Sequence, residues 1–160
     1  MDAVDKILTQ WNRERPDLDV GPMGLLGRLA RLRSHLAREI DAEFGRHGLN
    51  SSSFDVLATL RRSGPPYRLS PGELMETMMI TSGTMTNRID QLEKAGMVER
   101  LDNPDDRRGV IIALTDKGFE TVETAVTGHV ANQHRLVAAL DTHERQQFNA
   151  LLSKFLAAFE

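Results

Sequence analysis

The sequence predicts a mainly α-helical fold that contains one small β-hairpin. Apolar residues recur at helical spacing along most of the 160 residues. Two short strands are expected at residues 97–101 and 110–114, and the second is rich in β-branched residues. Two helices joined by a tight turn precede this hairpin. The order helix, turn, helix, hairpin is that of a winged helix-turn-helix, a fold in which one helix fits the DNA major groove.

A capping box marks the start of the first of these two helices. Ser70 can cap the helix, Pro71 suits its first position, and Glu73 stands where a capping box needs a carboxylate. The helix is expected to end near Met78, and residues 79–82 are expected to form the turn. This arrangement fixes where the following helix begins.

The second helix, expected at residues 82–95, has the composition of a DNA-reading helix. Thr81 or Ser82 can cap it, Gly96 stops it, and an apolar stripe is formed by Met85, Ile89 and Leu92. Its other faces carry short polar and basic side chains, and an asparagine can pair bidentately with adenine. The residues expected to contact DNA are Ser82, Thr84, Thr86, Asn87 and Arg88, with Arg107 and Arg108 at the hairpin tip.

The charge balance argues against DNA binding unless the fold sorts charges by face. The formal net charge is −3 at pH 7. Residues 81–109 contain five basic and six acidic side chains. Because affinity for DNA depends on the charges at the interface, Asp90 and Glu93 should point away from phosphate or pair with arginines.

Composition excludes several other classes of protein. The chain has no cysteine, which excludes disulfides, thiolate catalysis and cysteine-based metal sites. It shows no apolar run of membrane-spanning length and no signal-peptide pattern, so a cytoplasmic protein is expected. His129 and His134 are five residues apart, which is not the spacing of a helical zinc pair. No nucleophile–base constellation is present, and we expect no enzymatic activity, no metal and no cofactor.

The expected winged region, residues 51–115, is flanked by helices within one compact domain. Residues 1–15 form an extra N-terminal helix, and residues 22–50 and 116–160 form a helical region expected to mediate dimerisation. The last helix, expected at 143–159, has an apolar stripe that must be buried. Its members are Phe148, Leu151, Leu152, Phe155, Leu156 and Phe159. A symmetric homodimer is the economical way to cover such a stripe.

The amino-acid sequence of residues 69–118 resembles that of the MarR family of bacterial transcription regulators. The likeness is carried by SGTMTNRID at 82–90, LEKAGMVER at 92–100, DRRG at 106–109 and LTDKG at 114–118. The resemblance implies a homodimer that is helical at its dimerisation end. It also implies one winged helix per subunit, reading a palindromic operator in double-stranded DNA.

A narrower resemblance is to the urate-responsive subfamily, which includes the PecS-type regulators. That subfamily has an extra N-terminal helix with a tryptophan, matched by Trp11, and ligand-site residues matched by Asp55, Arg62 and Arg100. A recognition-helix arginine implicated in coupling matches Arg88. The resemblance implies a repressor released by a small planar anion, such as urate or a related purine or organic acid. An aromatic surface, fixed positive charge and a hydrogen-bond acceptor suit such a ligand.

Simpler interpretations of the ligand-site residues and of the terminal helices remain open. Asp55 and Arg62 could be a structural ion pair, and Trp11 could simply pack in the core. A regulator of this type could also answer to a different ligand, or to none. A helical protein-interaction module would explain the terminal helices, but it would leave the polar helix face at Asn87 and Arg88 unexplained.

Overall fold

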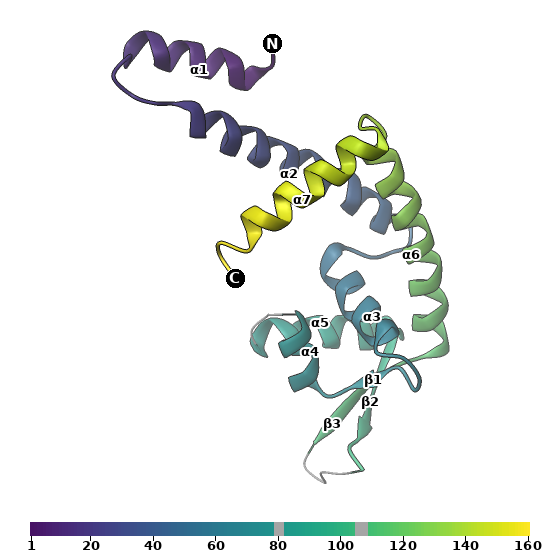
Figure 1. The fold of residues 1–160 in the computed structure, drawn as a ribbon. Coiled ribbons are helices and arrows are strands. Elements are labelled where there is room, and N and C mark those ends of the chain that lie inside the picture. The colour runs from purple at the N-terminus through teal and green to yellow at the C-terminus, as the bar shows by residue number, and fades with distance from the viewer. Residues whose placement is uncertain (79–81, 105–108) are drawn as a thin grey trace. The chain divides into compact units, whose positions relative to one another are not determined.

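A computed structural model of the chain describes residues 1–78, 82–104 and 109–160; the side chain of Ser82 is not part of that description. The chain divides into two compact units, Met1–Glu39 and Ile40–Glu160. Figure 1 shows the helices and strands, with the hairpin at one end of the larger unit.

The winged region closely matches its prediction. Its helices are α3 (Ser51–Arg62), α4 (Pro71–Met78) and α5 (Ser82–Lys94), and its hairpin strands are β2 (Val98–Asp102) and β3 (Val110–Leu114). Each bound lies within one residue of expectation. Of the turn expected at residues 79–82, residues 79–81 lie outside the described residues, and Ser82 already begins α5. The helix-turn-helix order and the hairpin are therefore confirmed.

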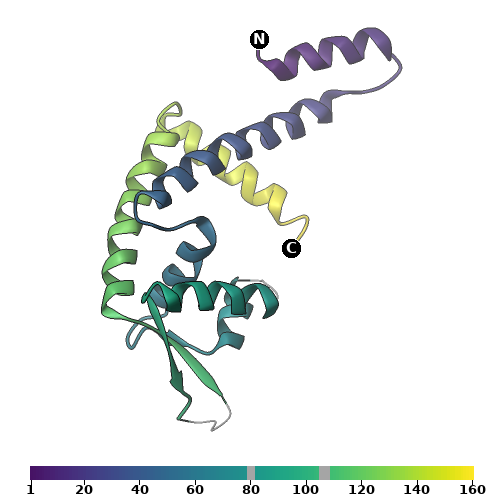
Figure 2. The same cartoon turned by 180° about the vertical axis from the view of Figure 1, so that it is seen from behind.

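A third, very short strand extends the sheet and was not predicted. Strand β1 (Arg68–Leu69) pairs antiparallel with β3, so the strand order is β1-β3-β2. Two residues are too few to produce a recognisable alternation of apolar and polar side chains. The pairing places β3 in the centre of the sheet and leaves β2 at an edge. Figure 2 shows the hairpin from behind.

Capping predictions in this region are confirmed by hydrogen bonds. The Ser70 backbone N–H donates to Glu73 Oε2 at 2.7 Å, and the Glu73 backbone N–H donates to Ser70 Oγ at 3.2 Å. Both bonds complete the capping box. The backbone N–H of Ser70, and after it the Ser70 hydroxyl, donate to the Glu73 carboxylate and lower its pKa. Asn50 caps α3 in the same reciprocal way with Ser53.

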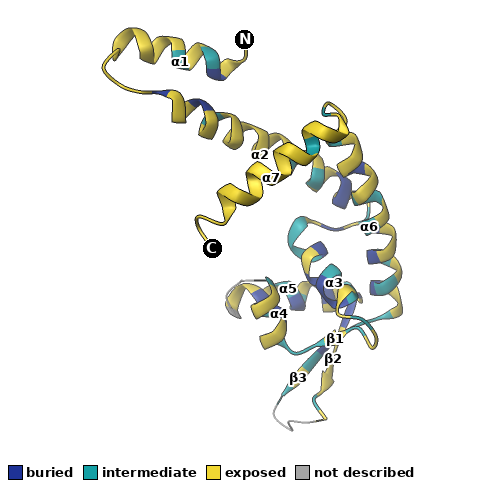
Figure 3. Ribbon diagram, in the orientation of Figure 1, coloured by how far each residue is buried: buried dark blue, intermediate teal, exposed yellow. Residues whose placement is uncertain are grey.

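One apolar core holds the winged region together. The stripe of α5 lies in it as predicted, since Met85, Ile89 and Leu92 are all buried. Figure 3 shows buried residues gathered where α3, α5 and the sheet meet. The largest fully buried side chains of the core are Leu57, Leu60, Leu74, Met85 and Ile112. Burial on one stripe leaves the other faces of α5 free for a partner.

The two C-terminal helices are shorter than predicted. The apolar pattern predicts that the helix beginning at Asp116 runs to about Leu140, but α6 (Asp116–Leu136), capped by Thr115, ends four residues earlier. Helix α7 (Thr142–Leu156) ends three residues before the expected end at 159. The chain must reverse direction between them, and residues 137–140 are used for that turn. Asp141 and Glu144 match the capping-box pattern in the sequence, and their hydrogen bonds confirm it. No residue of α7 is buried.

In the N-terminal unit, α1 (Ala3–Glu14) packs across α2 (Gly21–Gly45) at two glycines. A Cβ added to Gly24 would lie 3.0 Å from Leu8 Cδ1, so the glycines let the two helices approach closely. Arg28 on α2 also pairs with two acidic residues at the start of α1, Asp2 and Asp5. The sequence predicts this helix from about Met23, but α2 begins two residues earlier, because a proline in the first turn needs no N–H partner.

None of the helices in the described residues is long and apolar enough to cross a membrane.

Candidate nucleic-acid interface

The exposed face of α5 carries the short polar side chains that were expected to read bases. Thr84, Thr86 and Asn87 are exposed, and Asn87 Oδ1 accepts a hydrogen bond from Gln91 Nε2 at 3.4 Å. Ser82 is the first residue of the helix. The buried stripe on the opposite side of the helix fixes which side chains face outward. This geometry suits insertion of α5 into a groove of DNA.

The predicted wing contacts cannot be placed, because Arg107 and Arg108 lie outside the described residues. The strands that lead to them are described as far as Pro104 on one side and from Gly109 on the other. Their backbones are tied by a hydrogen bond from Asn103 N–H to the Gly109 carbonyl oxygen at 3.1 Å. The two arginines stay predicted DNA contacts.

The C-terminal end of α5 is held by the residues that begin α6. Lys117 Nζ donates to the carbonyl oxygen of Ala95 at 2.6 Å, and Thr115 Oγ1 donates to that of Gly96 at 2.7 Å. A Cβ on Gly118 would lie 1.9 Å from the Met97 carbonyl oxygen, so only glycine fits there. These contacts explain the LTDKG motif at residues 114–118: its side chains and its glycine hold the C-terminal end of α5 in place.

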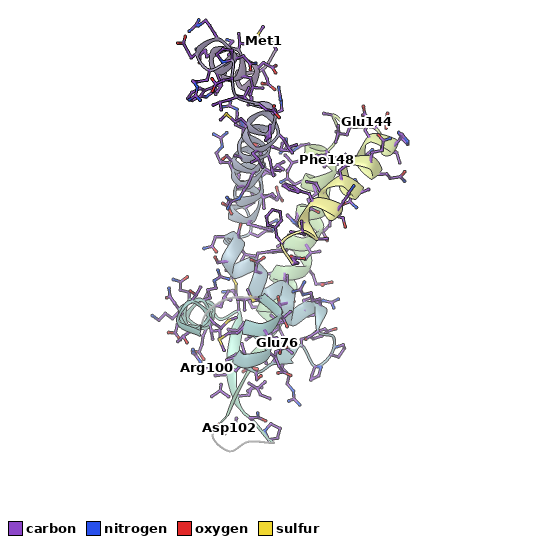
Figure 4. The ribbon with its side chains drawn as sticks, turned by 60° about the vertical axis from the view of Figure 1, so that its left-hand side comes forward. Met1, Glu76, Arg100, Asp102, Glu144 and Phe148 are labelled. Carbon is purple, nitrogen blue, oxygen red and sulfur yellow. The ribbon has the colours of Figure 1, made fainter. Side chains whose placement is uncertain are left out.

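Arg100 on β2 joins the hairpin to α5. Its guanidinium forms ion pairs with Asp90 and Glu93, both on α5 (Figure 4 labels Arg100). These bonds raise the pKa of Arg100, the hydrogen bond to Asp90 most of all. The expectation that these two carboxylates pair with an arginine is confirmed. The guanidinium of Arg100 is thus paired with carboxylates of the neighbouring helix and not with Asp55.

The carboxylate of Asp55 on α3 stands near several cationic groups without a bonded partner. It makes no hydrogen bond or ion pair with any described residue. Partial burial raises the pKa of Asp55, while the charges of Arg88, Arg62 and His129 act to lower it. Asp55 and Arg62 therefore do not form the structural ion pair that was one alternative. An acceptor left open beside cationic groups can receive a donor from a ligand.

Arg62 and Trp11 complete the set of predicted ligand residues. Arg62 is exposed and donates a hydrogen bond from Nη2 to Thr59 Oγ1 at 3.2 Å. Trp11 lies on α1, in the unit Met1–Glu39, and is 42% exposed rather than packed in a core. The structure brings Asp55, Arg62 and Arg88 into one electrostatic neighbourhood, and the part of Trp11 in a shared site stays a prediction.

Sequence reasoning missed His129 as a neighbour of Asp55. Its ring lies 4.9 Å from Phe44 and 5.3 Å from Phe54 between ring centroids, and its Nδ1 is buried without a hydrogen-bond partner among the described residues. The only feature of the sequence that could have indicated this neighbour is a histidine on the apolar side of the helix that became α6. Among the described residues, no group of three or more histidine, aspartate or glutamate side chains could hold a metal ion.

Comparisons with known proteins agree with this geometry. The sequence pattern of the MarR family matches residues 49–110. The HTH-type transcriptional regulator PecS of Dickeya dadantii (strain 3937) is 41% identical over 151 residues, which cover 94% of this chain and 91% of PecS.

Two solved structures with DNA are also similar. A mutant of MarR from E. coli, complexed with operator DNA, has a TM-score of 0.72 at 27% identity, covering 91% of this chain and 97% of that one. Sco3205, a MarR family transcriptional regulator from Streptomyces coelicolor in complex with DNA, has a TM-score of 0.76 at 27% identity, covering 88% of both chains. The chain therefore belongs to the MarR family of transcriptional regulators, and it is a DNA-binding regulator rather than an enzyme.

Proposed function

We propose that the protein is a homodimeric repressor that binds a palindromic operator and is released from it by a small planar anion. The observation that carries the proposal is the combination of an exposed polar face on α5 with an unpaired, partly buried carboxylate at Asp55 beside Arg88 of that helix. One face of the region suits DNA, and a charged group behind it suits a ligand. A repressor of this kind would act in the cytoplasm, with the chromosome.

The dimer is supported by apolar surface that one chain leaves uncovered. The exposed apolar side chains of the C-terminal helix and its end are Phe148, Leu151, Leu152, Phe155, Leu156 and Phe159. In the N-terminal unit, α2 exposes Met23, Leu25, Leu26, Leu29 and Leu32. Surface of this kind is typical of an obligate interface rather than of a monomer. A second copy of the chain is the partner we propose for it.

DNA reading is assigned to α5 and the hairpin tip. Thr84, Thr86 and Asn87 can reach base edges in the major groove, and Ser82 and Arg88 belong to the same helix. Arg107 and Arg108 would contact the minor groove or the adjacent phosphates. A dimer would place two α5 helices at half-sites about 34–36 Å apart, which explains why the operator should be palindromic.

The ligand is assigned to Asp55, Arg62 and Arg100, with Trp11 as the aromatic surface. Asp55 can accept N–H groups of urate, a related purine or another planar acid, and the arginines can bind its negative charge. An anion would compete with Asp90 and Glu93 for Arg100, and so disturb how α5 is held. By linkage, the ligand must weaken DNA binding by the same factor by which DNA weakens ligand binding.

A DNA-shift titration combined with tryptophan fluorescence tests this function. Wild-type protein should bind the DNA that flanks its own gene, and urate should release that DNA while quenching Trp11. A matched variant, Arg62→Ala, should bind the same DNA and lose the response to urate. If the DNA is bound but neither urate nor a related purine or organic acid releases it, the ligand proposal is wrong and the DNA-binding regulator stands.

A further inference from the structure

We propose that Arg100, with Asp90 and Glu93 as its partners, positions the reading helix α5 on the hairpin and thereby sets how well the protein discriminates its operator. The proposal deepens the proposed function and rests on α5 being the helix that reads DNA. It assigns Arg100 a role in the protein without ligand. In this role Arg100 acts through the helix and need not touch DNA.

Arg100 occupies a place in the sheet where an apolar side chain would be expected. In the hairpin register it stands opposite Ile112, which is fully buried, and two residues after Val98, which is also buried. Because side chains alternate along a strand, Arg100 and Val98 share the core side of β2, and Glu99 points to the other side. An arginine at such a position needs a partner nearby, and α5 provides it.

The two carboxylates engage different nitrogens of the same guanidinium. Nη2 contacts Asp90 Oδ1 and Nη1 contacts Glu93 Oε2. Asp90 and Glu93 are three residues apart on α5, so they lie on one side of the helix. The Arg100 side chain is 32% exposed. A planar group held at two points fixes the rotation of the helix about its axis better than a single contact would.

The contacts gather at the C-terminal half of α5. Lys117 and Thr115 bond to the carbonyl groups just after the helix, and Arg100 holds its last two turns. The polar positions from Thr84 to Asn87 lie in the first two turns. If these contacts were lost, α5 could rotate slightly about its axis. Such a rotation would move the residues from Thr84 to Asn87 out of register with the base edges.

The positioning role and the electrostatic repulsion between these carboxylates and DNA predict opposite effects on DNA binding when Asp90 and Glu93 are removed. Asp90 and Glu93 are negative charges on the helix that faces DNA, so charge alone says that their removal strengthens binding. If they hold the helix in register, their removal weakens specific binding although the protein becomes less negative. An exposed ion pair contributes little to stability, so the fold should survive the change.

The experiment uses the full-length protein and a duplex that the wild-type protein selects from a random pool. Asp90→Ala with Glu93→Ala should weaken binding to this duplex about 10-fold, the effect of losing one base pair of readout. Binding to a scrambled duplex should stay equal or become tighter, so the specificity ratio falls at least as far. Alanine favours helix, so α5 itself is not weakened.

A matched control removes the same charge elsewhere. Glu76→Ala with Glu99→Ala takes two exposed carboxylates from α4 and β2 that make no ion pair with any described residue. This control should bind the selected duplex as tightly as wild type or more tightly. Arg100→Met should match the double alanine variant, and combining the three substitutions should cause no further loss, because one contact network is removed only once.

Conservative variants keep the test decisive if the double variant does not fold, as judged by circular dichroism. Glu93→Gln should weaken specific binding by about 3-fold, and Arg100→Lys should do the same because an ammonium cannot hold two carboxylates in a fixed geometry. Undiminished specific binding by these variants, or by the double alanine variant, overturns the proposal. A wild-type protein that selects no sequence at all would overturn the proposed function, and this proposal with it.

Discussion

The winged region, residues 51–115, and the terminal helix α7 use their apolar residues in opposite ways. Leu57 and Leu60 in the winged region are completely buried, whereas Leu151 and Leu156 on α7 are 65% and 54% exposed. Figures 3 and 4 show the contrast, with α7 exposed along its length and Phe148 standing on its surface. The same residue type thus closes a core in one region and remains uncovered in the other.

The difference teaches that the two regions depend on different partners. The winged region satisfies its apolar side chains within one chain, so its folding needs nothing further. Helix α7 has an amphipathic pattern that one chain does not bury. Folding of the reading surface and assembly of the dimer should therefore respond separately to substitution.

Leu152→Asp should abolish the dimer and leave the helices of the dimerisation region unfolded or aggregated, while the winged region keeps its own core. A charge placed at an interface that must be dry has no partner, and the cost of its desolvation exceeds what the interface gains. Light scattering and circular dichroism at micromolar concentration measure the result. Leu152→Met is the volume-matched control and should remain dimeric. A folded monomer of wild-type protein at this concentration would contradict the assignment of α7 to a dimer interface.

Leu60→Ala should lower the free energy of unfolding by about 3 kcal/mol without shifting the dimer dissociation constant measured below the unfolding temperature. The substitution leaves a cavity in the closed core of the winged region, which is the usual cause of losses of this size. Chemical denaturation and sedimentation measure the two quantities. If the dissociation constant changes by as much as the stability, the two regions are not separate.

Arg108→Ala should weaken operator binding by about 3- to 10-fold, with no change in stability or assembly. If the side chain contacts phosphate, the slope of log affinity against log salt should flatten by about one. Arg107→Ala is the neighbouring comparison, and the larger loss identifies the inserted side chain. Two variants with wild-type affinity and salt slope would remove the hairpin tip from the proposed interface.

The predictability of the fold followed the length and clarity of each local signal. Helices with a capping residue, such as those starting after Asn50 and Ser70, were placed correctly because a side chain must satisfy the first backbone N–H groups. Strand β1 was missed because two residues carry no periodicity. The end of α6 was misplaced because the apolar pattern continues through residues that the chain needs for a turn.

The site was predictable only in its residue types. Exposed polar residues on α5 follow from the buried stripe opposite them, which the sequence shows directly. The partner of Arg100 depends on which carboxylate lies nearest in three dimensions, and the strand-to-helix packing that brings Asp90 and Glu93 there has no local signal. His129 reaches Asp55 from another helix for the same reason.

The smallest predicted effect concerns the unpaired carboxylate in the winged region. Burial raises the pKa of Asp55, so the folded protein holds that proton more tightly than the unfolded chain, and stability is lost as pH rises through the folded-state value. Asp55→Asn should therefore raise the melting temperature at pH 7, by only about 1–3 °C because water screens a group that is only partly buried. The advantage should shrink as the pH falls through the folded-state pKa, where wild-type Asp55 takes up a proton.

Thermal unfolding at several pH values gives the comparison, with Glu120→Gln on the exposed side of α6 as a control for the change in net charge. A gain in stability from Asp55→Asn, together with loss of the response to urate, would mean that the carboxylate is kept at a cost to folding. A side chain that destabilises the region it belongs to is then explained by the ligand it receives. A variant that melts earlier than wild type at pH 7 would instead show that the attraction of Arg88, Arg62 and His129 outweighs the burial of Asp55.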